Sequence, residues 1–310
     1  MDKPLSSAVL FLIFNRPETT RLVFAEIRKA RPGKLYIAAD GPRKDRPGEF
    51  ENCRAAREVV SQIDWECEVR TLFREENLGC RMAVSSAIDW FFQNVEEGII
   101  LEDDCLPDQS FFLFCRELLA KYRNDTRIMH IGGVNYQSGS VTGDGSYYFS
   151  RYSHIWGWAT WRRAWAHYDV KMKTWPQFLE QNKIAGIFED RSIQRYWLKR
   201  FQETYEGEIN TWDYQWVYAI WVQNGFTVIP NVNLVSNIGF GEGATHPAQK
   251  SDKHFNMKTG SVSEIIHPSC IIVNKAADAR IFKHDFQGTF LSRVRNKIKN
   301  IFRKIVKKYD

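Results

Sequence analysis

Residues 98–112 read GIILEDDCLPDQSFF, and this stretch is the strongest indication of the fold in the chain. Three aliphatic residues lead directly into Glu102, Asp103 and Asp104, and a proline and two phenylalanines follow. The aliphatic run is typical of a strand buried inside a sheet. Three adjacent carboxylates at the end of that strand repel one another, so a positive charge is expected opposite them.

The chain before this stretch alternates between apolar strands and amphipathic helices. Strands are predicted at residues 8–14, 34–39, 68–73 and 98–101, and helices at 20–30, 54–63 and 81–94. This alternation predicts an α/β fold with a mixed, mostly parallel sheet that is flanked by helices. Ligands of such sheets bind at the carboxyl ends of the strands, where the polar turns NRP, ADGP and EDD all fall.

The second half of the chain has a different pattern. Short strands and aromatic loops follow residue 127, and two further helices are predicted at about 176–188 and 193–204. A strand is predicted at 227–234, interrupted by Pro230. No internal repeat separates the two halves, so we expect one domain, in which residues 1–105 form the first half and residues 106–280 the second.

A divalent cation would resolve the repulsion within the acidic triplet. Mg²⁺ and Mn²⁺ prefer oxygen ligands, and they commonly take one or two carboxylates together with phosphate oxygens and water. A cation bound to a diphosphate also makes that group a better leaving group. The alternative is an ordinary acidic turn, or an aspartate that caps the helix predicted after it.

The motifs AVLFLIFNRP, AADGPR, NLG, GIILEDDCLPDQSFF, IWGWATW and WDYQW follow one another in this order. Together they resemble glycosyltransferases of the GT-A (Rossmann-like) fold, a resemblance that covers residues 7–246. The chain looks most like bacterial family 2-like sugar transferases and, more distantly, the N-acetylglucosaminyltransferase I group. The resemblance implies that Asp104 binds the metal under the donor diphosphate and that Asp103 touches the ribose, or the metal through water.

Four further residues receive donor-binding roles from the resemblance. Arg16 would face the nucleotide, and Asp40 would accept a hydrogen bond from an N–H of uracil or guanine, as a carboxylate can. Asn77 and Gly79 belong to a turn that would let the backbone approach the donor. A solvated arginine and an ordinary turn remain the alternatives for Arg16 and for residues 40–42.

An acceptor site is expected around two tryptophan-rich segments. Inverting transfer needs a base, and the resemblance implies Asp213, with Tyr214 in place of the second acid of the related W-D-D-W pattern. Asp213 could instead cap the helix that follows, and Glu206 and Glu208 are weaker candidates for the base. Trp156, Trp158 and Trp212 are the candidate acceptor-binding residues, with a buried aromatic corner as the alternative.

The segment 239–246 contains three glycines and ends in His246. It resembles the mobile loop that closes over the donor in GT-A enzymes, and His246 would complete the metal site. A solvated loop histidine is the alternative.

Residues 290–309 read FLSRVRNKIKNIFRKIVKKY, with apolar residues at helical spacing and eight basic residues around them. This pattern predicts a C-terminal amphipathic helix, within residues 285–310, that lies on an anionic membrane surface. A helix packed on the domain and a nucleic-acid-binding arm are the alternatives.

Composition and charge exclude several classes of protein. The chain has 310 residues, of which 44% are hydrophobic, and can bury a sizeable core. Much of its net charge of +6 follows residue 290, so we expect no nucleic-acid partner. Six cysteines without a C-x-x-C pair predict reduced thiols in a cytosolic protein. The apolar run at 8–14 is too short to span a bilayer.

The sequence therefore predicts a glycosyltransferase that depends on Mn²⁺ or Mg²⁺ and uses a UDP or GDP sugar. Residues 1–105 would hold the nucleotide sugar and residues 106–280 the acceptor, and the resemblance favours an inverting reaction. The enzyme would act on a glycan or lipid-linked oligosaccharide at the inner face of a bacterial plasma membrane, in the synthesis of a cell-surface polysaccharide. A sugar nucleotidyltransferase is the first alternative, but it predicts a glycine-rich loop after the first strand. A non-catalytic carbohydrate- or membrane-binding protein is the second.

Overall fold

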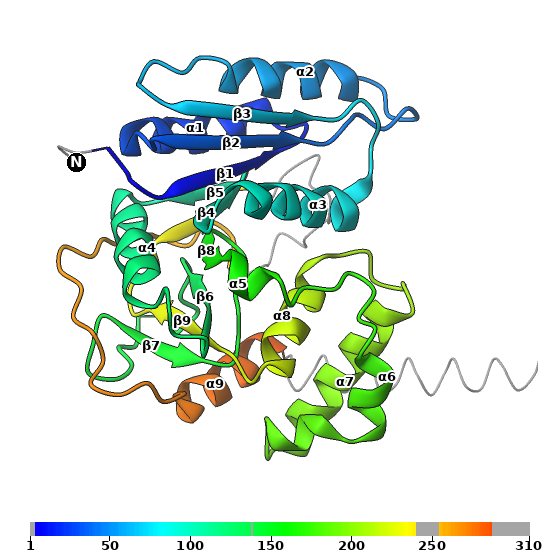
Figure 1. Cartoon of the computed structure of the whole chain (residues 1–310), viewed down its shortest axis with the longest axis vertical. Helices are drawn as coiled ribbons and strands as arrows, with labels where there is room; N and C mark the ends of the chain where they lie inside the picture. Colours follow the sequence, from blue (N-terminus) through cyan, green and yellow to red (C-terminus); the bar gives the residue numbers. More distant parts are fainter. Residues whose placement is uncertain (1–3, 138, 240–253, 287–310) are drawn as a thin grey trace, which may run out of the picture.

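A computed structural model describes residues 4–137, 139–239 and 254–286 (Figure 1). The strands are β1 Ala8–Ile13, β2 Lys34–Ala39, β3 Glu68–Phe73, β4 Glu97–Glu102, β5 Cys105–Pro107, β6 Ile128–Gly132, β7 Tyr147–Ser150, β8 Trp158–Trp161, β9 Phe226–Pro230 and β10 Val235–Asn237. The helices are α1 Pro17–Ala30, α2 Glu49–Val60, α3 Gly79–Asn94, α4 Gln109–Lys121, α5 Arg162–Trp165, α6 Trp175–Glu180, α7 Arg191–Tyr205, α8 Asp213–Val222 and α9 Lys275–Ile281, with helical turns η1 Lys183–Gly186 and η2 Phe282–Phe286.

The predicted α/β fold with a mixed, mostly parallel sheet is confirmed. Eight strands form one sheet in the order β3-β2-β1-β4-β8-β6-β9-β7. The first four strands of this order are mutually parallel, β8 and β7 run against them, and β6 pairs in parallel with β9. The sheet therefore continues from the first half of the sequence into the second without a break (Figure 1).

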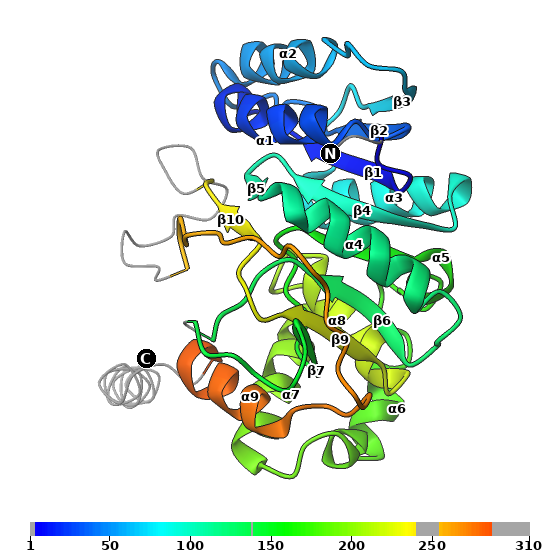
Figure 2. The ribbon, with the colours of Figure 1, turned by 90° about the vertical axis from the view of Figure 1, so that its left-hand side faces the viewer.

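Alternate residues of the central strands face two different helical layers. In β1, Val9 and Phe11 pack into a hydrophobic cluster with helices α1, α2 and α4, while Leu10 and Leu12 pack into a second cluster with α3. Figure 2 shows this arrangement edge-on, with the sheet between the helices. Because both faces are covered, a central strand reads as a continuous apolar run, as the sequence of β1 does.

Gly98 allows helix α3 to pack closely on strand β4. A Cβ atom at this position would lie 2.3 Å from Cζ of Phe91 and 3.0 Å from the carbonyl oxygen of Ala8. Real Cβ atoms do not approach other atoms this closely, so the glycine of the GIIL segment is required by packing. The acidic triplet is thereby carried on a strand that is tightly fixed between β1 and β8.

Several predicted element boundaries differ from the structure. Helix α2 begins at Glu49, five residues before the predicted start, because Glu49 is buried and bonded to Arg43 rather than exposed in a loop. The helix predicted at 176–188 is instead the short α6 followed by the turn η1. Strand β9 ends at Pro230, where the chain turns toward β10. Among the described helices, none combines the length and apolarity needed to cross a bilayer.

Candidate active site

A pocket of about 410 Å³ lies at the carboxyl ends of β1, β2 and β4. Ligands of open α/β sheets bind at this edge. The described residues that were predicted for donor, metal, base or acceptor contact and that line the pocket are Arg16, Asp40, Asn77, Gly79, Asp103, Asp104, Trp156, Trp212 and Asp213. The fold thus brings together residues that are up to 197 positions apart in the sequence, from Arg16 to Asp213.

The positive charge that faces the acidic triplet belongs to Arg16. Its Nη1 atom donates to Oδ2 of Asp104 at 2.6 Å and lies 3.7 Å from Oδ1 of Asp103. Burial lowers the pKa of the guanidinium, but the two carboxylates outweigh burial and raise its pKa above the ordinary value. The predicted partner of the triplet is therefore, in part, a side chain 88 residues earlier in the chain.

Asp103 and Glu102 are carboxyl groups whose pKa values are raised by their surroundings. Asp103 accepts a hydrogen bond from the backbone N–H of Phe14 at 2.9 Å, and burial together with Asp104 raises its pKa. Burial, followed by the charges of Asp104 and Asp103, raises the pKa of Glu102 well above its usual range. The charge of Asp213, which lines the same pocket, contributes to the same shift.

The segment after β9 holds the acidic turn in place. Strand β10 pairs antiparallel with β5, and the N–H of Ile238 donates to the carbonyl oxygen of Asp104 at 2.8 Å. A Cβ at Gly239 would lie 2.1 Å from Oδ2 of Asp104, so only glycine allows the chain to pass this close. Residues 235–239 thus form one wall beside the candidate metal ligand.

The carboxylate oxygens of the acidic turn suit a cation that phosphate oxygens also coordinate. Within the described residues, no three His, Cys, Asp or Glu side chains are arranged to hold a metal ion by themselves. An ion completed by a diphosphate and water needs one or two carboxylates from the protein. Asp104 can supply one, because Arg16 donates to its Oδ2 atom, whereas Oδ1 accepts from the thiol of Cys105, a weak donor, at 3.5 Å.

Asp40 binds the start of helix α3. Its carboxylate accepts hydrogen bonds from the N–H groups of Gly41, Leu78 and Gly79 at 3.0–3.2 Å and from Nδ2 of Asn77 at 3.0 Å. A negative charge at a helix N-terminus is favourable. Both oxygens are therefore already engaged within the protein, and the contact of Asp40 with a nucleobase stays a prediction from the resemblance. Asn77 and Gly79 line the pocket as partners of Asp40.

Two further arginines line the pocket, and neither was identified from the sequence. Nε of Arg43 donates to both oxygens of buried Glu49, at 3.0 and 3.1 Å, and its guanidinium lies 5.6 Å from the ring centre of Phe14. Nη2 of Arg74 donates to Oγ of Ser86 at 2.8 Å. Arg43 stands three residues after Asp40 in the motif ADGPR, close to the carboxyl end of a strand. This position could have identified Arg43 as a pocket residue from the sequence.

Asp213 lines the same pocket from the start of α8. It is the first residue of α8, whereas Trp212 is the N-cap residue, so the capping alternative for Asp213 is wrong. Oδ1 of Asp213 accepts from Oγ1 of Thr211 and from the N–H of Tyr214, the latter at 3.0 Å. Glu206 and Glu208, the weaker candidates for a base, do not line the pocket.

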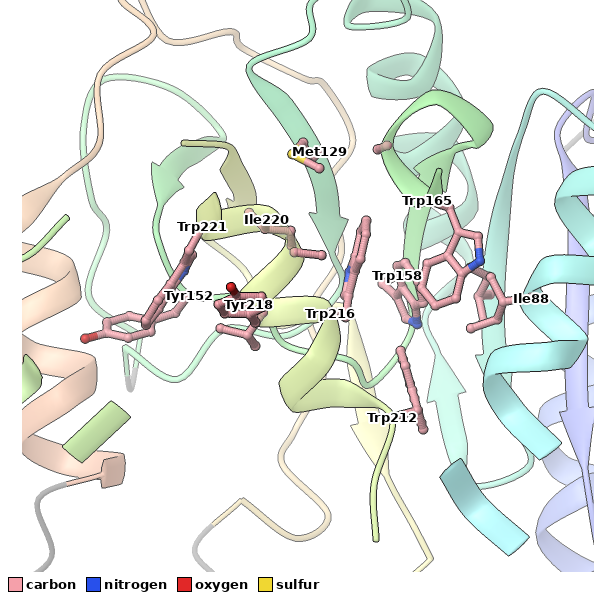
Figure 3. Close-up of a cluster of buried hydrophobic side chains, with 14 of the residues drawn as sticks. Ile88, Met129, Tyr152, Trp158, Trp165, Trp212, Trp216, Tyr218, Ile220 and Trp221 are labelled. Carbon is pink, nitrogen blue, oxygen red and sulfur yellow. The ribbon is translucent and has the colours of Figure 1, made fainter. Parts of the chain in front are cut away.

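Two of the three predicted acceptor-binding tryptophans are core residues. Trp158 is 0% exposed and does not line the pocket, so the prediction that it contacts an acceptor is wrong. Its ring centre lies 5.0 Å from that of His130 and 5.7 Å from that of Trp212. Figure 3 shows Trp158 beside Trp212 within the aromatic cluster. Trp212 is 1% exposed, although it is among the residues that line the pocket. Trp156, which precedes β8, is partly exposed and lines the pocket.

Two predictions fall outside the described residues. His246, the second proposed metal ligand, lies in the segment 240–253, and the predicted membrane-associating helix lies in 287–310. Both remain predictions from the sequence.

No family model matches the chain, and no curated protein matches it. Among solved structures, HddC from Yersinia pseudotuberculosis is 7% identical and overlaps with a TM-score of 0.30, covering 51% of this chain and 77% of HddC. UDP-glucose pyrophosphorylase complexed with UDP-glucose is 9% identical with a TM-score of 0.32, covering 52% and 78%. The second enzyme belongs to the class given above as the first alternative. Overlaps this small do not discriminate between the functions.

Proposed function

We propose that the chain is a glycosyltransferase that moves a sugar from a nucleoside diphosphate to the hydroxyl of a glycan. The observation that supports this most is the composition of the pocket, which combines three arginines, aspartates at the ends of strands and a further aspartate at the start of α8. Arginines suit phosphate groups because their planar forks donate in pairs. Carboxylates on separate elements provide for a cation and for a base.

In this proposal Asp213 acts on the acceptor. As the acceptor oxygen attacks the anomeric carbon, its proton passes to the Asp213 carboxylate, and the bond from that carbon to the diphosphate oxygen breaks with its electron pair. Thr211 and the N–H of Tyr214 orient the carboxylate. Arg43 and Arg74 would bind the diphosphate or the nucleotide. A Mg²⁺ or Mn²⁺ bound at Asp104 would neutralise the charge on the leaving group.

The turn between β1 and α1 supports this proposal over a sugar nucleotidyltransferase. A nucleotidyltransferase is expected to cradle phosphates with backbone N–H groups of a glycine-rich loop after the first strand. Here the turn reads FNRPE, and the N–H of Phe14 donates to Asp103 instead. The nucleotidyltransferase stays the second candidate, because three arginines in one pocket would also suit a nucleoside triphosphate.

Thermal-shift titrations would test the proposal. The full chain is titrated with UDP-, GDP- and CMP-sugars, and with nucleoside triphosphates, each with and without Mn²⁺. We expect one diphosphate sugar to raise the melting temperature, more strongly with Mn²⁺. Formation of pyrophosphate from a triphosphate and a sugar 1-phosphate would establish the second candidate instead. The absence of any nucleotide effect would contradict both and favour a non-catalytic carbohydrate-binding protein.

The acceptor is proposed to be a glycan or lipid-linked oligosaccharide at an anionic membrane. The support is the sequence of residues 290–309, in which basic residues surround an apolar stripe. Each basic residue close to an anionic surface adds about 1 kcal/mol of binding free energy.

A further inference from the structure

Beyond the pocket, three aromatic rings and one carboxylate gather beside Trp156. We call Tyr136, His154, Trp156, His254 and Asp285 the rim cluster. Of these residues, only Trp156 was predicted above to bind an acceptor. The rim cluster therefore needs an explanation of its own.

The rings of the rim cluster are in direct contact. The ring centre of Tyr136 lies 4.3 Å from that of His154 and 4.0 Å from that of His254. Trp156 meets Tyr136 edge-on, with ring centres 5.9 Å apart. Nε2 of His254 lies 3.0 Å from Oδ1 of Asp285, which joins the turn η2 to the cluster.

Sheet topology explains why these residues meet at the pocket. Tyr136 follows the carboxyl end of β6, while His154 and Trp156 precede β8, which runs in the opposite direction, so all three lie at the same sheet edge. His254 is placed there by the next residue, because Phe255 forms a bridge with Asn237. Asn237 and Trp156 both line the pocket, which makes the rim cluster continuous with it.

The cluster offers exposed faces and buried polar atoms together. Tyr136, Trp156 and His254 are partly exposed, whereas His154 is 6% exposed. Nε2 of His154 is buried and has no hydrogen-bond partner among the described residues. Burial lowers the pKa of His154 to about 4, so its ring is neutral near pH 7 and can exchange a hydrogen bond with a hydroxyl or water.

We propose that Tyr136, Trp156 and His254 form the subsite that holds the pyranose ring of a neutral acceptor glycan. The inference rests on the proposed function and adds the place and the charge class of the acceptor. Rigid aromatic faces suit the C–H face of a pyranose, and the polar atoms of His254 suit its hydroxyls. An anionic sugar would meet Asp285 and the acidic turn of the adjoining pocket, so a neutral sugar is favoured.

Saturation-transfer NMR on the full chain would test the subsite, with methyl glycosides of the common neutral hexoses as probes. We expect at least one glycoside to bind, and Tyr136→Ala to weaken it by about fivefold or more, the effect of losing one aromatic contact. His254→Gln, which removes the ring, should also weaken glycoside binding. It replaces Tyr136→Ala as the test variant if Tyr136→Ala does not fold. Tyr205→Ala, at an exposed tyrosine on α7, is the matched control and should change nothing.

Titration of UDP and GDP on the same variants separates this inference from the proposed function. We expect nucleotide affinity to stay within about twofold of the wild type, because neither Tyr136 nor His254 is among the residues that line the pocket. The subsite is disproved if no glycoside binds the wild type, if binding survives in Tyr136→Ala and His254→Gln, or if these variants lose nucleotide affinity instead. Glycoside binding without nucleotide binding would overturn the proposed function and leave the subsite standing.

Discussion

Arg16 and Asp104 make the contact on which metal binding would depend. Nη1 of Arg16 and Oδ2 of Asp104 are 2.6 Å apart, and the charge of the guanidinium offsets that of the carboxylate. A divalent cation bound at Asp104 would take over this task and leave Arg16 available for a phosphate. An arginine opposite an acidic turn is therefore compatible with a cation that arrives together with its diphosphate.

Asp104→Asn tests this arrangement because it keeps the shape of the side chain and removes its charge. We expect the Mn²⁺-dependent gain in nucleotide affinity to fall by about tenfold or more, the effect of losing a hydrogen bond or ligand contact to a charged group. Isothermal titration with and without Mn²⁺ measures it. Glu18→Gln, at a side chain that is 83% exposed on α1, is the control. An unchanged metal effect in Asp104→Asn would exclude Asp104 as the ligand.

Asp213→Asn tests the proposed base. The amide oxygen can still accept from Thr211 and from the N–H of Tyr214, so the start of α8 should keep its shape. Donor affinity should persist while kcat falls by about 100-fold or more, because the proton acceptor is lost. Glu208→Gln serves as the control, since Glu208 lies outside the pocket lining. Wild-type turnover in Asp213→Asn would place the base elsewhere.

At the scale of elements, Asp40 connects the end of β2 to the start of α3. Four donors, three of them backbone N–H groups, converge on its two oxygens. The N-cap residue of α3, Leu78, makes no side-chain capping hydrogen bond. The carboxylate of Asp40 accepts instead from the N–H groups at the start of this helix, which have no partners within the helix. The helix start in turn sets the positions of Asn77 and Gly79.

Asp40→Asn should therefore affect stability more than base selectivity. An amide group would turn its own hydrogens toward N–H donors, and the lost charge-assisted bonds should lower the free energy of unfolding by about 1–3 kcal/mol. Urea unfolding measures this, with Asp64→Asn, at a side chain that is 67% exposed, as the control. Unchanged stability together with an altered preference between UDP and GDP would instead support the predicted contact of Asp40 with the nucleobase.

At the scale of the whole molecule, the aromatic core joins the sheet to the second half of the chain. His130 on β6 donates from Nε2 to the carbonyl oxygen of His154 at 3.0 Å and accepts from Nε1 of Trp216 at 3.1 Å. Trp158, Trp165, Trp212 and Trp216 pack around this point (Figure 3). The accepting role of Nδ1 requires a neutral imidazole.

Acid should therefore destabilise the fold through His130. Burial lowers the pKa of His130 to about 3, below its ordinary value, so the unfolded chain binds the proton first. This contribution to stability is present above pH 6.5 and is lost as the pH falls toward 3. His130→Gln should reduce the slope of unfolding free energy against pH, between pH 6 and 4, by about 1.4 kcal/mol per pH unit.

Urea unfolding across this pH range measures the slope. His154 contributes to the slope of unfolding free energy against pH in the same direction as His130, because burial lowers its pKa to about 4. Asp278 acts in the opposite direction, because burial raises its pKa to about 6 and its contribution is lost as the pH rises. His167→Gln, at an exposed histidine, is the control for the substitution itself. An unchanged slope in His130→Gln would mean that His130 titrates alike in the folded and unfolded chain.

Deleting residues 290–310 tests the predicted membrane contact. The full chain should sediment with anionic vesicles and less so with neutral ones, and added salt should weaken binding, because the attraction is screened over about 8 Å at physiological ionic strength. The shortened chain should stay in the supernatant and keep its nucleotide affinity. Sedimentation of the shortened chain, or none of the full chain, would show that this segment is not the anchor.

The sequence by itself determined the sheet and the edge that carries the pocket. Continuous apolar runs in β1 and β4 mark strands covered on both faces, and the polar turns after them mark the carboxyl ends. These signals are local, because burial and strand period are written into a few consecutive residues. Asp104 and Asp213 could be proposed in the same way, from acids beside apolar or aromatic runs.

Only the tertiary structure decided which side chains meet. The pairing of Arg16 with Asp104 spans 88 residues and depends on β1 lying beside β4. The same holds for Arg43 in the pocket and for Tyr136 beside His254, which come from distant segments. Trp156 and Trp158 stand two residues apart in one motif, yet one lines the pocket and the other is buried, because β8 begins at Trp158 between two strands of the sheet. Local pattern encodes burial and period, whereas the order of strands determines the partners.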